Sequence, residues 1–131
     1  MANPNIAGSS TTIYGNTTYY TPSGTSAVVL LTNAASSNSV AKINQIVAAN
    51  VTSSAATATV SIYTNGAVAQ GSAPSGGTAY PIAYQISVPP NASLVVVDKT
   101  SALYLMENSC ISITSGTGSA ITYSISYELI S

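Results

Sequence analysis

Apolar and polar residues alternate with a period of two along much of this sequence, which is the pattern of a half-buried β-strand. The clearest case is residues 121–129, where Ile, Tyr and Leu alternate with Thr, Ser and Glu. Residues 57–63 show the same period, with Ala58, Val60 and Ile62 on one face. In residues 82–88 the alternation predicts that Ile82, Tyr84, Ile86 and Val88 face the core, and that Ala83, Gln85 and Ser87 face solvent.

Other segments are apolar on both faces, which predicts more fully buried strands. They are residues 27–31 (AVVLL) and 94–97 (LVVV). Residues 40–51 form a further strand, which starts with Ile43 on one parity and then places Ile46 beside Val47, and this change predicts a bulge. Residues 102–106 and 110–114 complete the set, with a tight turn between them, so the sequence predicts seven to nine strands.

Clusters of Pro, Gly, Asn and Ser separate these segments, as in proteins built from hairpins. The predicted fold class is therefore all-β, an antiparallel β-sandwich or a jelly-roll-like arrangement. Residues 22–131 are expected to form one domain. Within it, residues 65–79 (NGAVAQGSAPSGGTA) are too weakly patterned for a core element, and we expect an exposed loop there.

Residues 1–21 are polar apart from a few large side chains, so they predict either an extra strand or an N-terminal arm that packs on a neighbouring subunit. Tyrosine is common at subunit interfaces. The interface candidates are therefore Ile13, Tyr14, Tyr19 and Tyr20 of this segment, together with Tyr63, which the alternation places on the outer face. Tyr84, Tyr123 and Tyr127 have core parity.

Charge is nearly absent: the chain has two Lys, no Arg, no His, and three acidic residues, with a formal net charge of −1. Two lysines cannot supply the many phosphate contacts of a nucleic-acid-binding protein, and they argue equally against an anionic membrane surface. No window approaches the roughly 20 apolar residues that span a bilayer. The first ten residues do not resemble a secretory signal, so we expect synthesis in a cytoplasm.

The same scarcity bears on catalysis, because proton transfer near neutral pH most often uses His. The single cysteine, Cys110, has no His or Arg partner to activate it, and the spacing of Asp98, Glu107 and Glu128 indicates no carboxylate pair. No oxygen-rich loop has the regular ligand spacing of a calcium site. We expect no catalytic residues, no metal site, no cofactor and no enzymatic activity.

Three stretches of this sequence resemble small virion proteins from tailed phages of cyanobacteria and other marine bacteria. They are residues 37–51 (SNSVAKINQIVAANV), 86–99 (ISVPPNASLVVVDK) and 103–113 (LYLMENSCISI). The acidic-Gly turn that is usual in that group is replaced here by Met106, Glu107, Asn108 and Ser109, which keeps a turn and removes an acid. The resemblance implies a β-sandwich or jelly-roll-like virion component bound to the capsid exterior.

The expected function is that of a capsid decoration, or cement, protein that stabilises the shell by non-covalent adhesion. Its expected partners are the major capsid protein and copies of itself, as a trimer or a dimer. The main alternative is a tail or fibre module that binds host-surface glycans. A bacterial surface-layer or pilus subunit would need an export signal. Attachment by either virion protein would involve neither nucleic acid nor a membrane.

Overall fold

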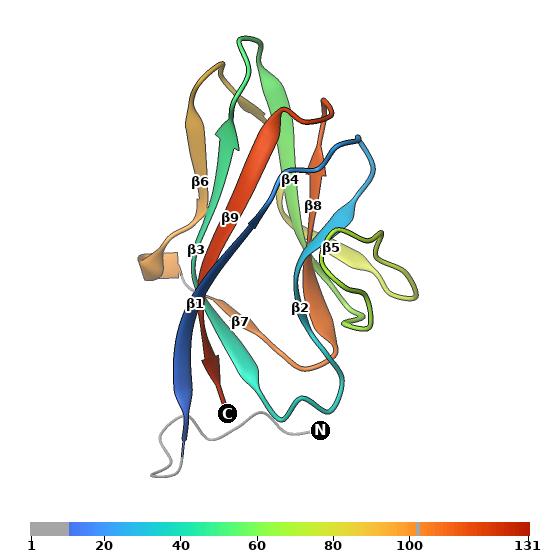
Figure 1. Ribbon diagram of the computed structural model, residues 1–131, viewed down its shortest axis with the longest axis vertical. Helices are drawn as coiled ribbons and strands as arrows, with labels where there is room; N and C mark the ends of the chain where they lie inside the picture. Colours follow the sequence, from blue (N-terminus) through green and yellow to red (C-terminus); the bar gives the residue numbers. More distant parts are fainter. Residues whose placement is uncertain (1–10, 102) are drawn as a thin grey trace.

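The computed structural model describes residues 11–101 and 103–131, which form two antiparallel sheets packed face to face (Figure 1). Sheet A has the order β1-β9-β3-β6, with β7 also paired to β3, and sheet B has the order β2-β8-β4-β5. The all-β sandwich prediction is confirmed, with nine strands. The strands are β1 Ile13–Tyr20, β2 Val28–Asn33, β3 Val40–Asn50, β4 Ala56–Tyr63, β5 Ala79–Val88, β6 Ser93–Val97, β7 Leu103–Leu105, β8 Ser109–Ser115 and β9 Ile121–Ile130, with a short 3-10 turn, η1 Lys99–Ser101.

The main core lies between the two sheets, where the alternating residues of the central strands meet. On β9 the predicted inward residues Ile121, Tyr123 and Ile125 are fully buried. The Tyr123 hydroxyl crosses to the other sheet and donates a 2.5 Å hydrogen bond to the Thr114 carbonyl oxygen. This bond satisfies the only polar atom of that side chain, as burial of a tyrosine requires.

The bulge predicted in residues 40–51 is present in β3. Its register with β9 shifts between Ile43 and Gln45, and its register with β6 shifts between Ile46 and Val47. These shifts return both Ile43 and Ile46 to the core side, where neither is exposed. Along its other edge β3 pairs first with β7 and then with β6.

Residues 13–20 form an extra strand, β1, which pairs with β9 over eight residues. Cross-strand partners lie on the same face of a sheet. Tyr20, opposite the buried Tyr123, therefore packs against the core, whereas Tyr19, opposite Ser124, stays 70% exposed. Residues 1–10 lie outside the described part, so an arm formed by them remains a prediction.

Residues 65–78 form the predicted loop, and part of it covers the outer face of sheet B. Val68 packs there against Val29, Tyr63 and Cys110 in a small second core. The prediction that Tyr63 is an outward interface residue is therefore wrong in one respect: it is on the outer face but only 9% exposed. Its hydroxyl accepts a hydrogen bond from the Gly77 amide, which fixes the loop over the ring.

The alternation prediction for β5 is also wrong. Among its apolar residues only Val88 is buried, whereas Ile82, Tyr84 and Ile86 are exposed and Ala83 packs against the core. For Ile82, Ala83 and Tyr84 the cause is a double irregularity in the pairing with β4: Ile82 is inserted between two pairs, and Tyr84 and Gln85 together oppose the single residue Thr59. Each insertion reverses the parity of the residues beyond it.

Candidate interaction surface

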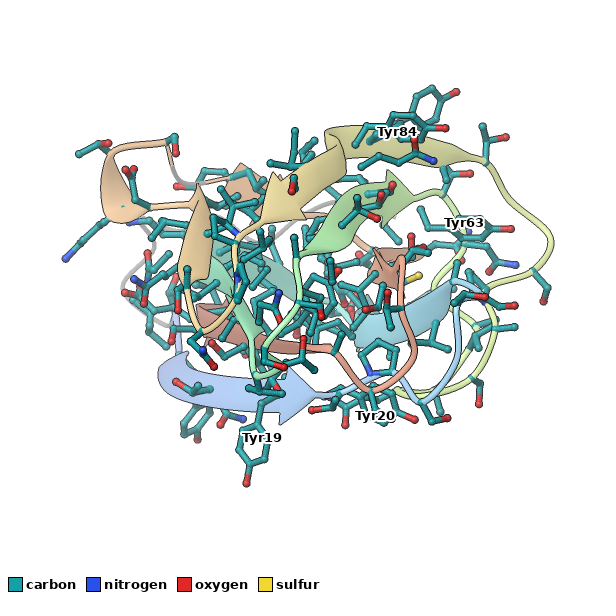
Figure 2. All side chains as sticks on the ribbon, turned by 90° about the horizontal axis from the view of Figure 1, so that it is seen from above. Tyr19, Tyr20, Tyr63 and Tyr84 are labelled. Carbon is teal, nitrogen blue, oxygen red and sulfur yellow. The ribbon has the colours of Figure 1, made fainter. Side chains whose placement is uncertain are left out.

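The largest row of exposed apolar side chains in the described part of the chain lies on β5. Tyr80, Ile82, Tyr84 and Ile86 are 59%, 40%, 63% and 42% exposed, and all four belong to β5. In Figure 2 the Tyr84 side chain projects away from the body of the molecule. We call these four residues the β5 row. The two bulges put them on both sides of the strand, since Tyr80 and Ile86 pair with core-facing residues whereas Tyr84 opposes Thr59. Exposed apolar side chains that gather along one edge strand are typical of interaction sites.

The position of β5 explains why these residues are not covered. It is the last strand of sheet B, so sheet A packs mainly on the strands inside it. Tyr80 and Ile86 pair with Ile62 and Ala58, whose side chains face the core, yet they remain exposed at this edge. Solvent therefore reaches apolar side chains that a central strand would bury.

The backbone of β5, by contrast, is poorly suited to pairing with another strand. Pro81 has no amide proton, and Gln85 adopts a positive φ of 48° at the second bulge. The Gln85 amide donates to the Thr59 hydroxyl at 2.9 Å and is thereby used within the sheet. These features disfavour edge-to-edge strand addition, so the β5 row is suited to contacts made by side chains.

The five candidates predicted from the sequence are not one surface. Ile13, Tyr14 and Tyr19 are 54%, 65% and 70% exposed on β1, whereas Tyr20 packs on the core and Tyr63 lies beneath the loop. In Figure 2, Tyr19 and Tyr84 lie on opposite sides of the molecule. The three exposed candidates are spread along β1 at the edge of sheet A, with Tyr14 on the opposite face of the strand from Ile13 and Tyr19.

Sequence reasoning missed the β5 row and assigned Tyr84 to the core. Pro81 was the available signal, because proline within a strand is confined to edges and bulges. Val95 of β6 and Tyr104 of β7 were also missed, and both are about half exposed. Residues 94–97 are less buried than predicted, because β6 lies at the edge of sheet A.

The few charged groups are dispersed or used locally. Lys42 and Glu128 are cross-strand partners on the outer side of sheet A, and the Asn44 amide donates to Glu128 Oε1 at 3.2 Å. Asp98 begins the η1 turn, where hydrogen bonds from Thr100 and then Ser101 hold the pKa of its carboxyl below the ordinary value. Glu128 and Asp98 are therefore used in a strand pair and in a turn, and the charged side chains do not gather into a charged patch.

Two other ionisable groups are in the interior. Burial raises the pKa of the Cys110 thiol to about 11 and the pKa of the Tyr123 hydroxyl to about 12. A thiol with this pKa is a poor nucleophile at neutral pH. Among residues 11–101 and 103–131 no three His, Cys, Asp or Glu side chains are grouped as a metal site would require. The same residues include no helix long and apolar enough to cross a membrane.

Comparison with known proteins gives little further information. No protein-family model matches the sequence, and no curated protein matches it either. A solved structure described as "Structure of infectious bursal disease virus Gt strain" contains a chain with 13% identity to this one and a TM-score of 0.28. The match covers 91% of this protein but only 30% of that chain. A similarity this low supports no conclusion about function.

Proposed function

We propose that this protein is a structural component of a tailed-phage virion that attaches to the outside of the capsid as a decoration, or cement, protein. The observation that carries the proposal is the β5 row, four exposed apolar side chains on a nearly uncharged sandwich. The resemblance of residues 37–51, 86–99 and 103–113 to phage virion proteins supports the virion setting. The proposed role is adhesion without catalysis.

The physical basis of this adhesion is burial of side chains of the β5 row against a partner surface. Burial of apolar area contributes about 25 cal/mol per Å² removed from water. Tyrosine suits such contacts, because its ring supplies area while its hydroxyl forms hydrogen bonds at the rim. A decoration protein would place these contacts across the junctions between capsomers and so oppose their separation.

The proposed partners are the major capsid protein and copies of this chain. Each copy exposes apolar side chains in two regions, the β5 row and the β1 residues Ile13, Tyr14 and Tyr19, and Tyr84 and Tyr19 lie on opposite sides of the sandwich (Figure 2). A molecule with two such regions can contact the shell with one and a neighbouring copy with the other. A dimer or trimer would then add weak contacts through effective concentration.

The test is to locate and count the protein on purified phage particles. We expect gold-labelled antibody to mark the capsid exterior, and quantitative gels to give a copy number comparable to that of the major capsid protein. Label confined to the tail, in low copy number, would support the fibre alternative instead. Absence from purified particles would reject a virion role altogether.

A further inference from the structure

A groove of about 370 Å³ lies between residues of the edge strands β1 and β2. Figure 1 shows the course of these two strands. The groove is lined by residues 16–18 of β1 and 30–32 of β2, together with Gln70 of the loop and Tyr127 of β9. This volume falls within the range of small-molecule sites. It is distinct from the β5 row, which lies at the opposite edge of sheet B.

The groove is held in shape by the loop. Val29 of β2 exchanges backbone hydrogen bonds of 2.9 Å with Gly71 and Ser72, so the loop adds to the free edge of β2. Gln70 then reaches across, and its Nε2 donates to Leu30 O and to Thr18 Oγ1 at 2.9 Å each. One amide thus joins sheet B to sheet A and fixes one end of the groove.

Every residue that lines the groove is uncharged, and several of its polar atoms keep unused hydrogen-bonding capacity. Tyr127 OH accepts a bond from Asn16 Nδ2 at 3.2 Å, and its own proton has no acceptor within the described residues. Gln70 Oε1 likewise accepts no hydrogen bond from the residues that the structure describes, while its Nε2 is fully used. The groove therefore presents both a fixed donor and a fixed acceptor.

We propose that this groove binds a neutral saccharide, with Tyr127 OH, Gln70 Oε1 and the Thr18 hydroxyl contacting the sugar hydroxyls. A sugar hydroxyl both donates and accepts, so it can use the donor and the acceptor together. The absence of charge from the lining disfavours phosphate, nucleotides and acidic or basic peptides. Leu31 is half-buried and supplies apolar contact for the ring carbons of the sugar.

Few groups of the groove contact a sugar, so we expect weak binding by one site, with a dissociation constant on the order of 1 mM. Repetition of the subunit on a particle would raise the avidity by a large factor. This proposal is independent of where on a virion the protein is located, because it needs only the groove.

The experiment is an NMR titration of the full-length protein with glucose, galactose, mannose and N-acetylglucosamine, and with galacturonic acid as a charged reference. We expect at least one neutral sugar to shift the backbone amides of residues 16–18, 30–32 and 70 saturably. Gln70→Glu should weaken that binding about tenfold or more. Tyr127→Phe, which keeps the ring and removes only the hydroxyl, should also weaken sugar binding. This second variant tests the proposal even if Gln70→Glu loosens the loop.

Gln45→Glu is the matched control, because Gln45 is an exposed residue of β3 outside the groove. It makes the same change of charge and should leave sugar binding unaltered. The proposal is overturned if no sugar shifts these amides, or if both groove variants bind as tightly as the wild type. It is equally overturned if the same amides shift when the protein concentration is raised without sugar. The edges of β1 and β2 would then be a self-association site.

Discussion

Among the glycines of the described residues, Gly66 leaves the least space between a side chain and the backbone of other segments. Substitution by alanine tests this packing. A Cβ at this position would lie 2.3 Å from the Asn33 carbonyl oxygen and 2.8 Å from the Ser109 amide nitrogen. Asn33 is itself held in place, because its buried amide donates to the carbonyl oxygens of Ser39 and Leu105 at 3.0 Å. The neighbours of Gly66 therefore have little freedom to move.

We predict that Gly66→Ala lowers the free energy of unfolding by about 1–3 kcal/mol, the usual cost of overpacking. Urea denaturation measures the effect. Gly15→Ala is the control, because nothing lies within 4 Å of a Cβ at Gly15, and it should not destabilise the protein. Equal stability of the two variants would show that the backbone around Gly66 relaxes freely.

Cys110 should make the stability depend on alkaline pH. Its thiol has an ordinary pKa of 9.0, which burial raises to about 11 in the folded protein. Above pH 9 the unfolded chain loses the thiol proton while the folded protein retains it, so rising pH favours unfolding. The contribution of Cys110 is thus fully present below pH 9 and declines as the pH approaches 11.

The measurement is urea unfolding at pH 8, 9, 10 and 11 for the wild type and for Cys110→Ala. We expect the wild type to lose more stability over this range than the variant does. Tyr123 contributes in both proteins, since burial also raises its pKa, so the difference between them isolates the thiol. Parallel curves would mean that the thiol ionises as easily in the folded state as in the unfolded one.

Among the elements, β1 is a structural strand more than a detachable arm. Tyr20 packs against the core and Tyr19 does not, although they are neighbours on the same strand. We predict that Tyr20→Ser lowers the free energy of unfolding by about 1.5–3 kcal/mol. Tyr19→Ser should change it by no more than about 0.5 kcal/mol. Thermal and urea unfolding compare the two.

This pairing also changes the expected effect of truncation. A detachable arm could be removed without unfolding the domain, but removal of residues 1–21 would remove the eight-residue ladder on β9 and the Tyr20 contact. We therefore expect the truncated protein to be markedly destabilised. If the truncated protein is as stable as the full chain, and Tyr20→Ser does not change the free energy of unfolding, then β1 is an arm and not a structural strand.

The β5 row should affect binding without affecting folding. We predict that Tyr80→Ser combined with Tyr84→Ser leaves the free energy of unfolding nearly unchanged, because both side chains are exposed. The same double variant should reduce attachment to particles by about tenfold or more, as the loss of two aromatic anchors would. Binding of fluorescent protein to particles stripped of it measures this.

Val51→Ser combined with Met106→Ser is the control, since both residues are exposed apolar side chains outside β5. If the control weakens attachment as much as the β5 variant does, adhesion depends on general surface hydrophobicity and not on this row.

The sequence predicted the central strands well and the edges poorly, for physical reasons. In β9 the period of two is unbroken and both neighbours in the sheet are present, so parity alone gives Ile121, Tyr123 and Ile125 as core. In β5 two bulges reverse the parity of the side chains. How far sheet A covers a strand of sheet B also depends on the position of that strand in the sheet, and β5 is at the edge. Local alternation contains neither fact.

Burial by a loop is equally hard to predict. Tyr63 has the parity of an outward residue and lies on the outer face, yet Val68 covers it from a segment with no periodicity. The groove also depends on this segment, because Gln70 reaches both sheets from a run of Gly, Ala and Ser. Only the three-dimensional course of residues 65–78 shows that the loop has a structural role.

At the scale of the whole molecule, near-neutrality is the dominant property, and it determines how any adhesion should respond to salt. Lys42 is half-buried opposite Glu128, so Lys99 is the more accessible of the two cations. Exposed ion pairs contribute about 0–1 kcal/mol each and are screened over roughly 10 Å at 0.1 M salt. An attachment that depended on these charges would weaken as salt is added.

Attachment through the β5 row has no such dependence. We predict that the protein stays on particles when sodium chloride rises from about 0.1 M to about 1 M, and that sulfate, which strengthens apolar burial, retains it more firmly. With no histidine in the chain, no transition between pH 6 and 8 should arise from this subunit. Washing purified particles across these conditions and quantifying the retained protein by gel tests this. A Tyr84→Lys variant should weaken binding at every salt concentration, because it places a charge in the apolar contact. Progressive release of the wild type by sodium chloride would show instead that charge, and not the β5 row, holds the protein to its partner.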